Sequence, residues 1–540
     1  MTRNKVLRTI LPILITLAIG GGLYYYAPPA LNIHDSRLWW TVIFLLVIYG
    51  FLRLIAGRRT LIENGRPNFK GFLGFAAAAV LAIVFMVIGL FTTPLFFSGR
   101  YAQAGQERIT TGDFSSEVQV VENGEITDIA IMDTTTAAAM GKRQIGSLGT
   151  LATQYELGQF MTTTVGGQAK KVATMGYGGF WKWLNRRGEG IPGYVSVDPV
   201  NGSSEYVEFP EPIHYSDTAY FNENIYRHMQ FAAPTAYFGN VHFEVDNDGN
   251  PYWIATTYAF RVGLTGCPVP NGVLVCDAVT GKTVRYSAEE APGWVSIVYP
   301  ADDLIRLVNY AGLYGNGYWN SMMAKTGVYR CTDDYGYKVV GENLNAFTGI
   351  TSAASDESNI AFILCDEHTG QVRRYDIYGA EEYSAETAAE GLVMNFGYRA
   401  SFPRLVNVNG SPVYVMALTD DGALIKKYAM VDLQDYTKVV AGDTIQDTWR
   451  QFVSKYGSGT AGNVPDMDGT GEVKTIRLTA PVEIAVVEGN SYAYLKAKDG
   501  IYRIPVDGNE EVLFISDGEE VELTVYETLR EGIFTAGLNK

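Results

Sequence analysis

The sequence predicts an α+β protein in which three N-terminal transmembrane helices precede tandem sheet-plus-helix modules and a small all-β C-terminal part. Three observations lead to this prediction. Three apolar runs of about 20 residues open the chain. Behind them, a motif of apolar residues, then Asp, then Thr-Gly or Asn-Gly recurs among hairpin turns. Apolar stripes with helical spacing stand between the copies of this motif.

The apolar runs are Ile10 to Tyr26, Leu38 to Ala56 and Gly71 to Phe97. Each is close to the ~20 residues that cross a bilayer as a helix. The first run follows a basic stretch, as in a signal peptide, but two more runs come directly after it, so we interpret it as a retained span. No run carries a charged residue at mid-span, which favours an anchor over a transport pathway. Residues 1–98 are therefore predicted to be a membrane anchor.

The basic residues predict the orientation of this anchor, because Lys and Arg concentrate in cytoplasmic loops. The loop between the first two runs holds only Arg37. The other basic residues lie before the first run, or at the end of the second run and in the loop that follows it: Arg3, Lys5, Arg8, Arg53, Arg58, Arg59, Arg66 and Lys70. We expect a cytoplasmic N-terminus, and everything after about Ser98 outside the cell in the cell envelope.

The composition narrows the range of partners. The chain has 540 residues and a formal net charge of −16, and a strong negative field repels phosphate backbones. Nucleic acid is therefore not an expected partner. The four cysteines lie in the predicted external part without a C-x-x-C pair, which argues against a zinc site. Two alternatives are open for them: disulfide bridges Cys267–Cys276 and Cys331–Cys365, or buried free thiols.

The repeated motif is clearest in NGVLVCDAVTGKTVRY, from Asn271 to Tyr286. Related copies are PGYVSVDPVNGSSEYV and IAFILCDEHTGQVRRY, and KKYAMVDLQDYTKVV is a looser fourth copy. Asp accepts backbone N–H bonds in tight turns, and Gly accepts positive φ. We therefore interpret the recurring pairs as structural turns rather than as ligands or catalytic acids: Asp198 with Gly202, Asp277 with Gly281, and Asp366 with Gly370.

Apolar residues at helical spacing lie between successive copies of the repeated motif and after the last copy. The clearest has Leu304, Leu307, Val308 and Ala311 on one face, and others lie near Ile225, Ala385 and Trp449. The resulting division is a leading α+β segment or stalk (99–190), tandem modules (191–457), a linker rich in Gly, Ser and Thr (458–471), and a small β-barrel-like domain (472–540).

The segments VSVDPVNG, VLVCDAVTG and ILCDEHTG resemble the signature of the PepSY domain, a small α+β module. The resemblance covers roughly Gly193 to Gly457, and the fourth copy departs from it with Asp435 and Tyr436 in place of Thr-Gly. It implies an extracytoplasmic location and binding or inhibition of a protein partner. The overall layout is also similar to multi-span membrane proteins of Gram-positive bacteria, a similarity that carries no activity with it.

The sequence offers no candidate catalytic, cofactor-binding or metal-ligating residues. The five histidines show no metal-ligand spacing, and no nucleophile motif or phosphate-binding glycine loop occurs. The stretch GFWKWLNRRGEGIPGY is open to two interpretations, a contact surface or core tryptophans. We expect a membrane-anchored binding or regulatory protein whose partners are the bilayer and an envelope or secreted protein. The alternative is a cell-envelope enzyme, such as a wall hydrolase, whose carboxylates meet only in three dimensions.

Overall fold

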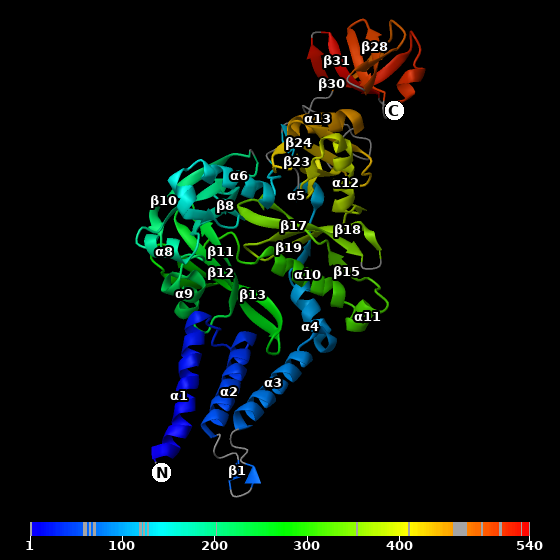
Figure 1. Cartoon of the computed structure of the whole chain (residues 1–540). Coiled ribbons are helices and arrows are strands. Elements are labelled where there is room, and N and C mark those ends of the chain that lie inside the picture. Colours follow the sequence, from blue (N-terminus) through cyan, green and yellow to red (C-terminus); the bar gives the residue numbers. More distant parts are fainter. Residues whose placement is uncertain are drawn as a thin grey trace.

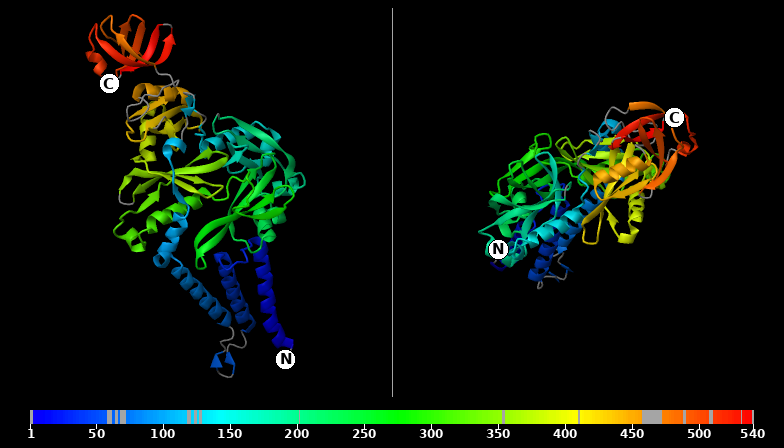
Figure 2. Two further views of the ribbon diagram at one scale, coloured as in Figure 1. Left: turned by 180° about the vertical axis from the view of Figure 1, so that it is seen from behind. Right: turned by 90° about the horizontal axis from the view of Figure 1, so that it is seen from above.

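A computed structural model describes most of the chain: residues 3–57, 62–63, 66–67, 72–117, 121–122, 125–126, 129–200, 202–352, 355–408, 411–456, 472–487, 490–506, 510–530 and 532–538. Helices occupy one end of the molecule, four sheets with their own helices follow, and a C-terminal sheet lies at the other end (Figures 1 and 2). The protein is therefore a mixed α+β chain. The expected linker, 458–471, lies outside the described residues.

The N-terminal end consists of α1 (Arg3–Tyr26), α2 (Ser36–Gly57) and α3 (Leu73–Phe91), with a short hairpin of β1 (Ile62–Glu63) and β2 (Arg66–Pro67) between the last two. By length and composition, Ser36–Ala56 and Leu73–Phe91 can cross a membrane, whereas the apolar part of α1, Ile10–Tyr26, is shorter. A Cβ at Gly74 would lie only 2.7 Å from Gly50 Cα, so α2 and α3 cross in backbone contact.

The third apolar run does not form one helix as expected. The Thr92 hydroxyl donates to Gly89 O and the Thr93 hydroxyl to Leu90 O, each at 2.8 Å, where α3 ends. Pro94 then begins α4 (Pro94–Gln106), because proline suits the first turn of a helix and not its interior. The chain therefore turns at Thr92, and α4 leads into the sheets and packs along α10 (Ala301–Tyr314).

The first sheet has the order β10-β9-β8-β6, with β7 also paired to β8. It crosses the boundary expected at residue 190, because β8 pairs with β9. Helix α6 packs on β9 and β10. The elements of this part are α5 (Phe114–Glu117), β4 (Val121–Glu122), β5 (Glu125–Ile126), α6 (Thr134–Gly146), α7 (Thr150–Gln154), β6 (Tyr155–Leu157), β7 (Met161–Val165), β8 (Gln168–Tyr177), α8 (Phe180–Arg186), β9 (Ile191–Val197) and β10 (Ser204–Ile213).

The second sheet is an antiparallel meander that begins after η2 (Phe221–Glu223) and α9 (Ile225–Ala232). Ile225 and Met229 of α9 share a buried core with strands of both the first and the second sheet. The helix therefore bridges two sheets and does not belong only to the strands before it. The strands are β11 (Phe238–Val245), β12 (Pro251–Val262), β13 (Gly266–Asp277) and β14 (Thr283–Ser287).

The third sheet is built around β17 and β18, and α10 packs against β15 and β18. Its edge strand is β3 (Ile109–Thr111), which pairs in parallel with β19 although more than 250 residues separate them. The other elements are α11 (Tyr318–Met322), β15 (Tyr329–Cys331), β16 (Gly336–Val340), β17 (Asn343–Ser352), β18 (Ser355–Asp366), β19 (Val372–Tyr375) and β20 (Gly379–Ala380).

The fourth sheet is covered on both faces. In β23, Val413, Val415 and Ala417 face a core that includes Trp449 of α13, whereas the alternate residues Tyr414, Met416 and Leu418 face Ala385 and Ala389 of α12. The elements are α12 (Glu382–Leu392), η3 (Met394–Phe396), β21 (Arg399–Ala400), β22 (Arg404–Val408), β23 (Ser411–Thr419), β24 (Ile425–Asp432), β25 (Val439–Gly442) and α13 (Ile445–Tyr456).

The C-terminal sheet has six strands in the order β26-β30-β31-β29-β28-β27 and its own buried core. Leu495, Tyr502 and Leu523 are fully buried in that core. The strands are β26 (Glu472–Arg477), β27 (Glu483–Val487), β28 (Asn490–Ala497), β29 (Gly500–Pro505), β30 (Glu520–Arg530) and β31 (Ile533–Leu538), with η4 (Glu510–Phe514) between the fourth and fifth.

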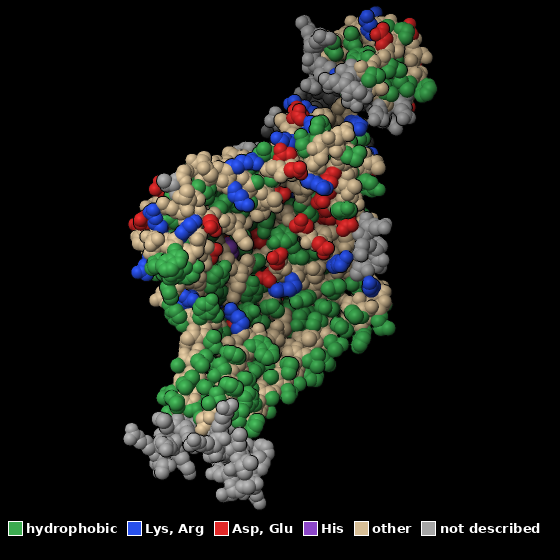
Figure 3. Space-filling view, viewed as in Figure 1, with side chains coloured by type: hydrophobic (Ala, Val, Ile, Leu, Met, Phe, Trp, Pro, Cys, Tyr) green, Lys and Arg blue, Asp and Glu red, His purple; other side chains and the backbone are tan. Residues whose placement is uncertain are grey.

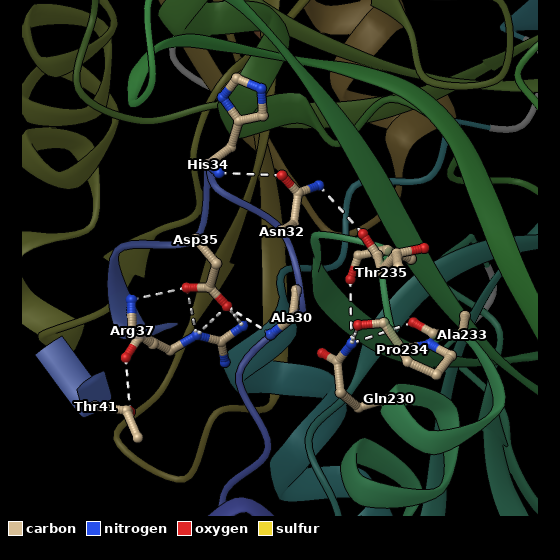
Figure 4. Close-up of polar contacts among 11 residues, drawn as sticks. Ala30, Asn32, His34, Asp35, Arg37, Thr41, Gln230, Ala233, Pro234 and Thr235 are labelled. Carbon is tan, nitrogen blue, oxygen red and sulfur yellow. Dashed lines mark hydrogen bonds and ion pairs between the residues drawn. The ribbon is translucent and has the colours of Figure 1, made fainter. Parts of the chain in front are cut away.

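The loop between α1 and α2 docks on the second sheet and α9 (Figure 4). Asp35, fully buried, accepts the Ala30 N–H at 2.8 Å and pairs with Arg37 at 2.9 Å, which fixes the shape of the loop. The Asn32 side chain donates to Thr235 O at 3.2 Å, so the loop is hydrogen-bonded to the chain just after α9.

Two further contacts hold the same junction. The His34 ring nitrogen lies 2.6 Å from Leu264 O, and the ring stacks on Phe260 with centroids 4.9 Å apart. On α9, Arg227 donates to Tyr26 O at the end of α1 at 3.1 Å. The helices therefore meet the sheets through buried and specific contacts rather than through a bare tether.

Candidate functional site

The four motif aspartates lie in turns of the same geometry. Each carboxylate accepts the backbone N–H two residues further on, at 2.8 to 2.9 Å: Val200 on Asp198, Val279 on Asp277, His368 on Asp366 and Gln434 on Asp432. In the first three turns the glycine N–H also bonds the carbonyl of the aspartate, and the glycines have φ of 72°, 75° and 72° at Gly202, Gly281 and Gly370. The aspartates thus shape hairpins.

The fourth turn, at Asp432, forms the same carboxylate-to-N–H hydrogen bond without a glycine. The Asp432 N–H bonds Lys438 O, six residues on, whereas the Asp277 N–H bonds Lys282 O, five residues on. Asp435, which replaces Thr, accepts the Thr437 N–H at 3.2 Å, just as the Thr280 hydroxyl accepts the Lys282 N–H. The turn therefore forms in all four copies, and one longer connection removes the need for positive φ.

We expect Asp277→Ala to lower the free energy of unfolding by about 1–2 kcal/mol, because the N–H groups of Val279 and Thr280 lose the acceptor that they share at 2.8 and 3.0 Å. The measurement is the melting temperature of the purified chain. Asp248→Ala, at an exposed aspartate of a neighbouring hairpin, is the matched control. Equal melting temperatures for the two variants would contradict a structural role.

The cysteines are free and buried. Cys267 and Cys276 stand at opposite ends of the continuous strand β13, where a rise of about 3.3 Å per residue keeps them roughly 30 Å apart. Of the two alternatives, the bridge between them is therefore excluded, because a disulfide needs Cα atoms within about 7 Å, and the alternative of buried free thiols holds. Cys331 and Cys365 lie on β15 and β18, with β17 between these strands. Burial raises the pKa of Cys276 to about 11 and of Cys331 to about 12, so these thiols stay protonated.

The histidines and the aromatic stretch GFWKW also make contacts that belong to the fold. Besides His34, ring nitrogens of His228 and His368 lie 2.6 and 2.7 Å from backbone carbonyls. Among the described residues no group of three or more His, Cys, Asp or Glu side chains is arranged to hold a metal ion. Trp183 is buried and donates to Glu223 at 2.7 Å, so the core interpretation of this stretch holds for Trp183, whereas Trp181 is 72% exposed.

Two buried carboxylates hold residues 295–301, which we call the hub segment. Glu244 of β11, fully buried, accepts the N–H groups of Ser296 and Ile297 at 2.8 and 3.1 Å and lies 2.8 Å from His242. Glu367, directly after β18, accepts the Ala301 N–H at 2.6 Å. Burial raises the pKa of the Glu367 carboxyl well above its ordinary value. The two acids therefore attach the second and third sheets to one segment.

The first sheet joins the same segment. The Ser296 hydroxyl lies 2.7 Å from the Thr163 hydroxyl and accepts the Thr164 N–H at 2.9 Å, both on β7. Three sheets thus meet at the hub segment through buried hydrogen bonds. Because a buried polar group is costly unless it is bonded, these residues fix the arrangement of the sheets.

Arg404 of β22 lowers the pKa of Lys171 of β8 and of Lys338 of β16, and we call these three residues the cation cluster. Lys171 is only 3% exposed, and its ammonium donates to the Thr162 and Thr134 hydroxyls at 2.9 and 3.2 Å. Arg404 is 7% exposed, and its Nε and Nη1 bond no described residue.

Burial, together with a smaller contribution from the charge of Arg404, lowers the pKa of Lys171 to about 7 and the pKa of Lys338 to about 8. Asp133, the N-cap of α6, acts in the opposite direction on the pKa values of Lys171 and Arg404. This cluster was not predicted from the sequence. The available signal was a charged residue inside an apolar strand, as at Lys171 in KKVATMGY.

No protein-family model and no curated protein matches the chain. Solved structures similar to it include a sialidase of Trypanosoma rangeli, 8% identical over 70% of this chain and 52% of that chain, with a TM-score of 0.15. A levansucrase of B. subtilis is 9% identical over 82% of this chain and 94% of that chain, also with a TM-score of 0.15. The chain spans about half the length of the sialidase. Matches at this score carry no argument about function.

Proposed function

We propose that the chain is a membrane-anchored, extracytoplasmic binding or regulatory protein that acts through protein–protein contacts and without catalysis. The observation that carries the proposal is the junction at the loop between α1 and α2 (Figure 4). This loop and the turn at Thr92 fasten the helices to the sheets at one end only. Below that junction the helices present a continuous hydrophobic surface, unlike the sheets above (Figure 3).

The charge distribution supports a cytoplasmic N-terminus. The α2–α3 connection carries Arg58, Arg59, Arg66 and Lys70 in its sequence. Its hairpin β1–β2 lies at the end of the helices that is remote from the sheets (Figure 1). Basic loops stay on the cytoplasmic side, so the sheets would face outward. In this proposal α1, α2 and α3 are three spans, and the apolar part of α1, Ile10–Tyr26, is the shortest of the three apolar stretches.

An exposed apolar group beside α4 also fits a nearby bilayer. On and just after α11, Trp319 is 67%, Met322 62% and Met323 79% exposed. Helix α11 packs against α4, which continues from α3. Clustered apolar side chains in contact with the chain that leaves a span suit the interface of a membrane, where Trp is favoured.

The repeated sheets support a binding role. We propose that they are PepSY-like modules and that the partner is an envelope or secreted protein, for which a peptidase is one candidate. A catalytic role would need carboxylates that are available to a substrate. Glu244 and Glu367, two acids that are almost fully buried, instead accept backbone N–H bonds from the hub segment. This favours binding over the alternative of a wall hydrolase.

The orientation is tested on whole cells with the wall removed. We expect a tag placed after Lys540 to be cut by added protease, because residues beyond Ser98 are proposed to lie outside. A second tag before the first helix, at the opposite end, serves as the control and should be protected. A protected C-terminal tag with a cleaved N-terminal tag would overturn the orientation, and cleavage of both would contradict three spans, because an odd number of spans puts the two termini on opposite sides.

A further inference from the structure

Helix α12 and the turn η3 that follows it carry large apolar side chains on the outside of the molecule. Tyr383 is 72% and Met394 77% exposed, and Leu392 and Phe396 are exposed as well. The other side of α12 packs on β23, β24 and β25 of the fourth sheet, so the helix cannot turn these side chains inward. Apolar side chains that are exposed together, rather than scattered singly, mark interaction sites.

Two carboxylates lie on the same side of the helix as Tyr383. Glu386 and Glu390 follow it after three and seven residues, a spacing that brings side chains together on one side of a helix. The apolar and acidic side chains thus belong to one continuous segment of the chain. We call them the α12 surface: Tyr383, Glu386, Glu390, Leu392, Met394 and Phe396.

Glu386 is surrounded by charge of its own sign. Partial burial, and after it the carboxylates of Asp334, Glu390 and Glu382, raise the pKa of Glu386 to about 7. Glu390 already pairs with Arg399 at 3.4 Å. A cation placed beside Glu386 would relieve the repulsion that this carboxylate meets when it ionises. The α12 surface therefore combines a negative charge that needs a partner with apolar side chains that need a cover.

The charge decides which kind of partner fits. The chain has a formal net charge of −16, and Asp and Glu side chains gather where α12 lies (Figure 3). A second copy docked through the same surface would bring Glu386 and Glu390 toward the same two acids of the first copy. Nucleic acid and anionic lipid are repelled in the same way. Helix α12 also lies far from the membrane helices (Figure 1). A cationic protein segment meets none of these obstacles.

We propose that the α12 surface binds a protein segment that carries Lys or Arg beside apolar side chains. The cation would lie against Glu386, and the apolar side chains would cover Tyr383, Met394 and Phe396. Such a segment replaces repulsion among carboxylates by an ion pair and removes exposed apolar area from water. The inference rests on the proposed binding function and gives its partner a chemistry.

The test is the fluorescence anisotropy of a labelled synthetic peptide of Lys and Leu, added to the purified full-length chain in phosphatidylcholine nanodiscs, with empty nanodiscs as the blank. We expect saturable binding that weakens as KCl is added. Matched peptides with Glu in place of Lys, or Ser in place of Leu, should not bind. Tyr383→Ser and Met394→Ser should each weaken binding about tenfold, as central apolar contacts do. Phe514→Ser, at an exposed phenylalanine of the C-terminal part, should leave binding unchanged.

The pH dependence isolates the contribution of Glu386. At pH 6 about one-tenth of an acid with a pKa of about 7 is ionised, whereas at pH 8 nearly all of it is. The Lys side chains of the peptide stay charged over this range. We therefore expect the wild type to bind up to about tenfold more tightly at pH 8 than at pH 6. Glu386→Gln should bind weakly and equally at both values.

The substituted positions are on the surface, so the variants should melt at the temperature of the wild type without peptide. Absence of saturable binding to the wild type would overturn the proposal, as would equal binding of the Glu peptide or binding unaffected by Glu386→Gln. Sedimentation as a dimer that Tyr383→Ser dissociates would assign the surface to a second copy and overturn it too. The protease experiment on cells is independent, so a wrong orientation and a wrong partner chemistry give different results.

Discussion

Gly105→Ala is expected to destabilise the contact between the helical end and the sheets. A Cβ at Gly105 of α4 would lie 1.9 Å from Leu307 O and 3.0 Å from the Ala311 Cβ, both on α10. A backbone carbonyl cannot rotate away as a side chain does, so the two helices must separate. Overpacking of this kind costs about 1–3 kcal/mol, although alanine is the better helix former.

The measurement is the melting temperature of the purified full-length chain, followed by intrinsic fluorescence. The matched control is Gly99→Ala on the same helix, where a Cβ meets nothing within 4 Å. That variant should be as stable as the wild type or slightly more stable, because glycine costs about 1 kcal/mol in a helix. If both variants melt at the same temperature, α4 and α10 are not in the close contact described.

Glu244→Ala is expected to have the largest effect, a loss of about 3–5 kcal/mol in the free energy of unfolding. The substitution removes a buried carboxylate that is the partner of His242 and the acceptor of two backbone N–H groups. Glu244→Gln should cost less, since its amide oxygen can still accept one of these bonds while its NH₂ faces a donor. Glu211→Ala, at an exposed position of β10, is the control and should change little.

Limited proteolysis gives a second readout of the same change. Ser296 and Ile297 belong to the hub segment, to which three sheets are attached. Its release in Glu244→Ala should expose cleavage sites near residue 296 before the rest of the chain is cut. Uniform cleavage, with the pattern of the wild type, would show that Glu244 does not hold this segment.

Local features of the fold were predictable from the sequence. The Asp-x-x-x-Gly turns at residues 198, 277 and 366 formed because all their hydrogen bonds lie within six residues. Helix α10 formed where the apolar stripe of Leu304, Leu307, Val308 and Ala311 predicted it. The third apolar run was predicted less well, because Pro94 and the threonine before it end one helix and begin another.

Long-range features were not predictable. The predicted boundary at residue 190 fails because β8 pairs with β9 across it. The pairing of β3 with β19 joins residues 109–111 to 372–374. Of the two alternatives for the cysteines, the bridge between Cys267 and Cys276 fails because the residues between them form a strand instead of a loop. None of these features is marked by a local sequence pattern, because each depends on which distant segment of the chain lies beside the residue.

The apolar helices, the turns and the amphipathic stripes follow from local sequence, because periodicity and turn chemistry act over a few residues. Which sheet each helix covers, and which charges lie close together, depends on how distant segments pack. Lys171, Lys338 and Arg404 are separated by more than 60 residues each, and they meet because three sheets pack around one junction. Their chemistry follows from desolvation and mutual repulsion, which no single segment contains.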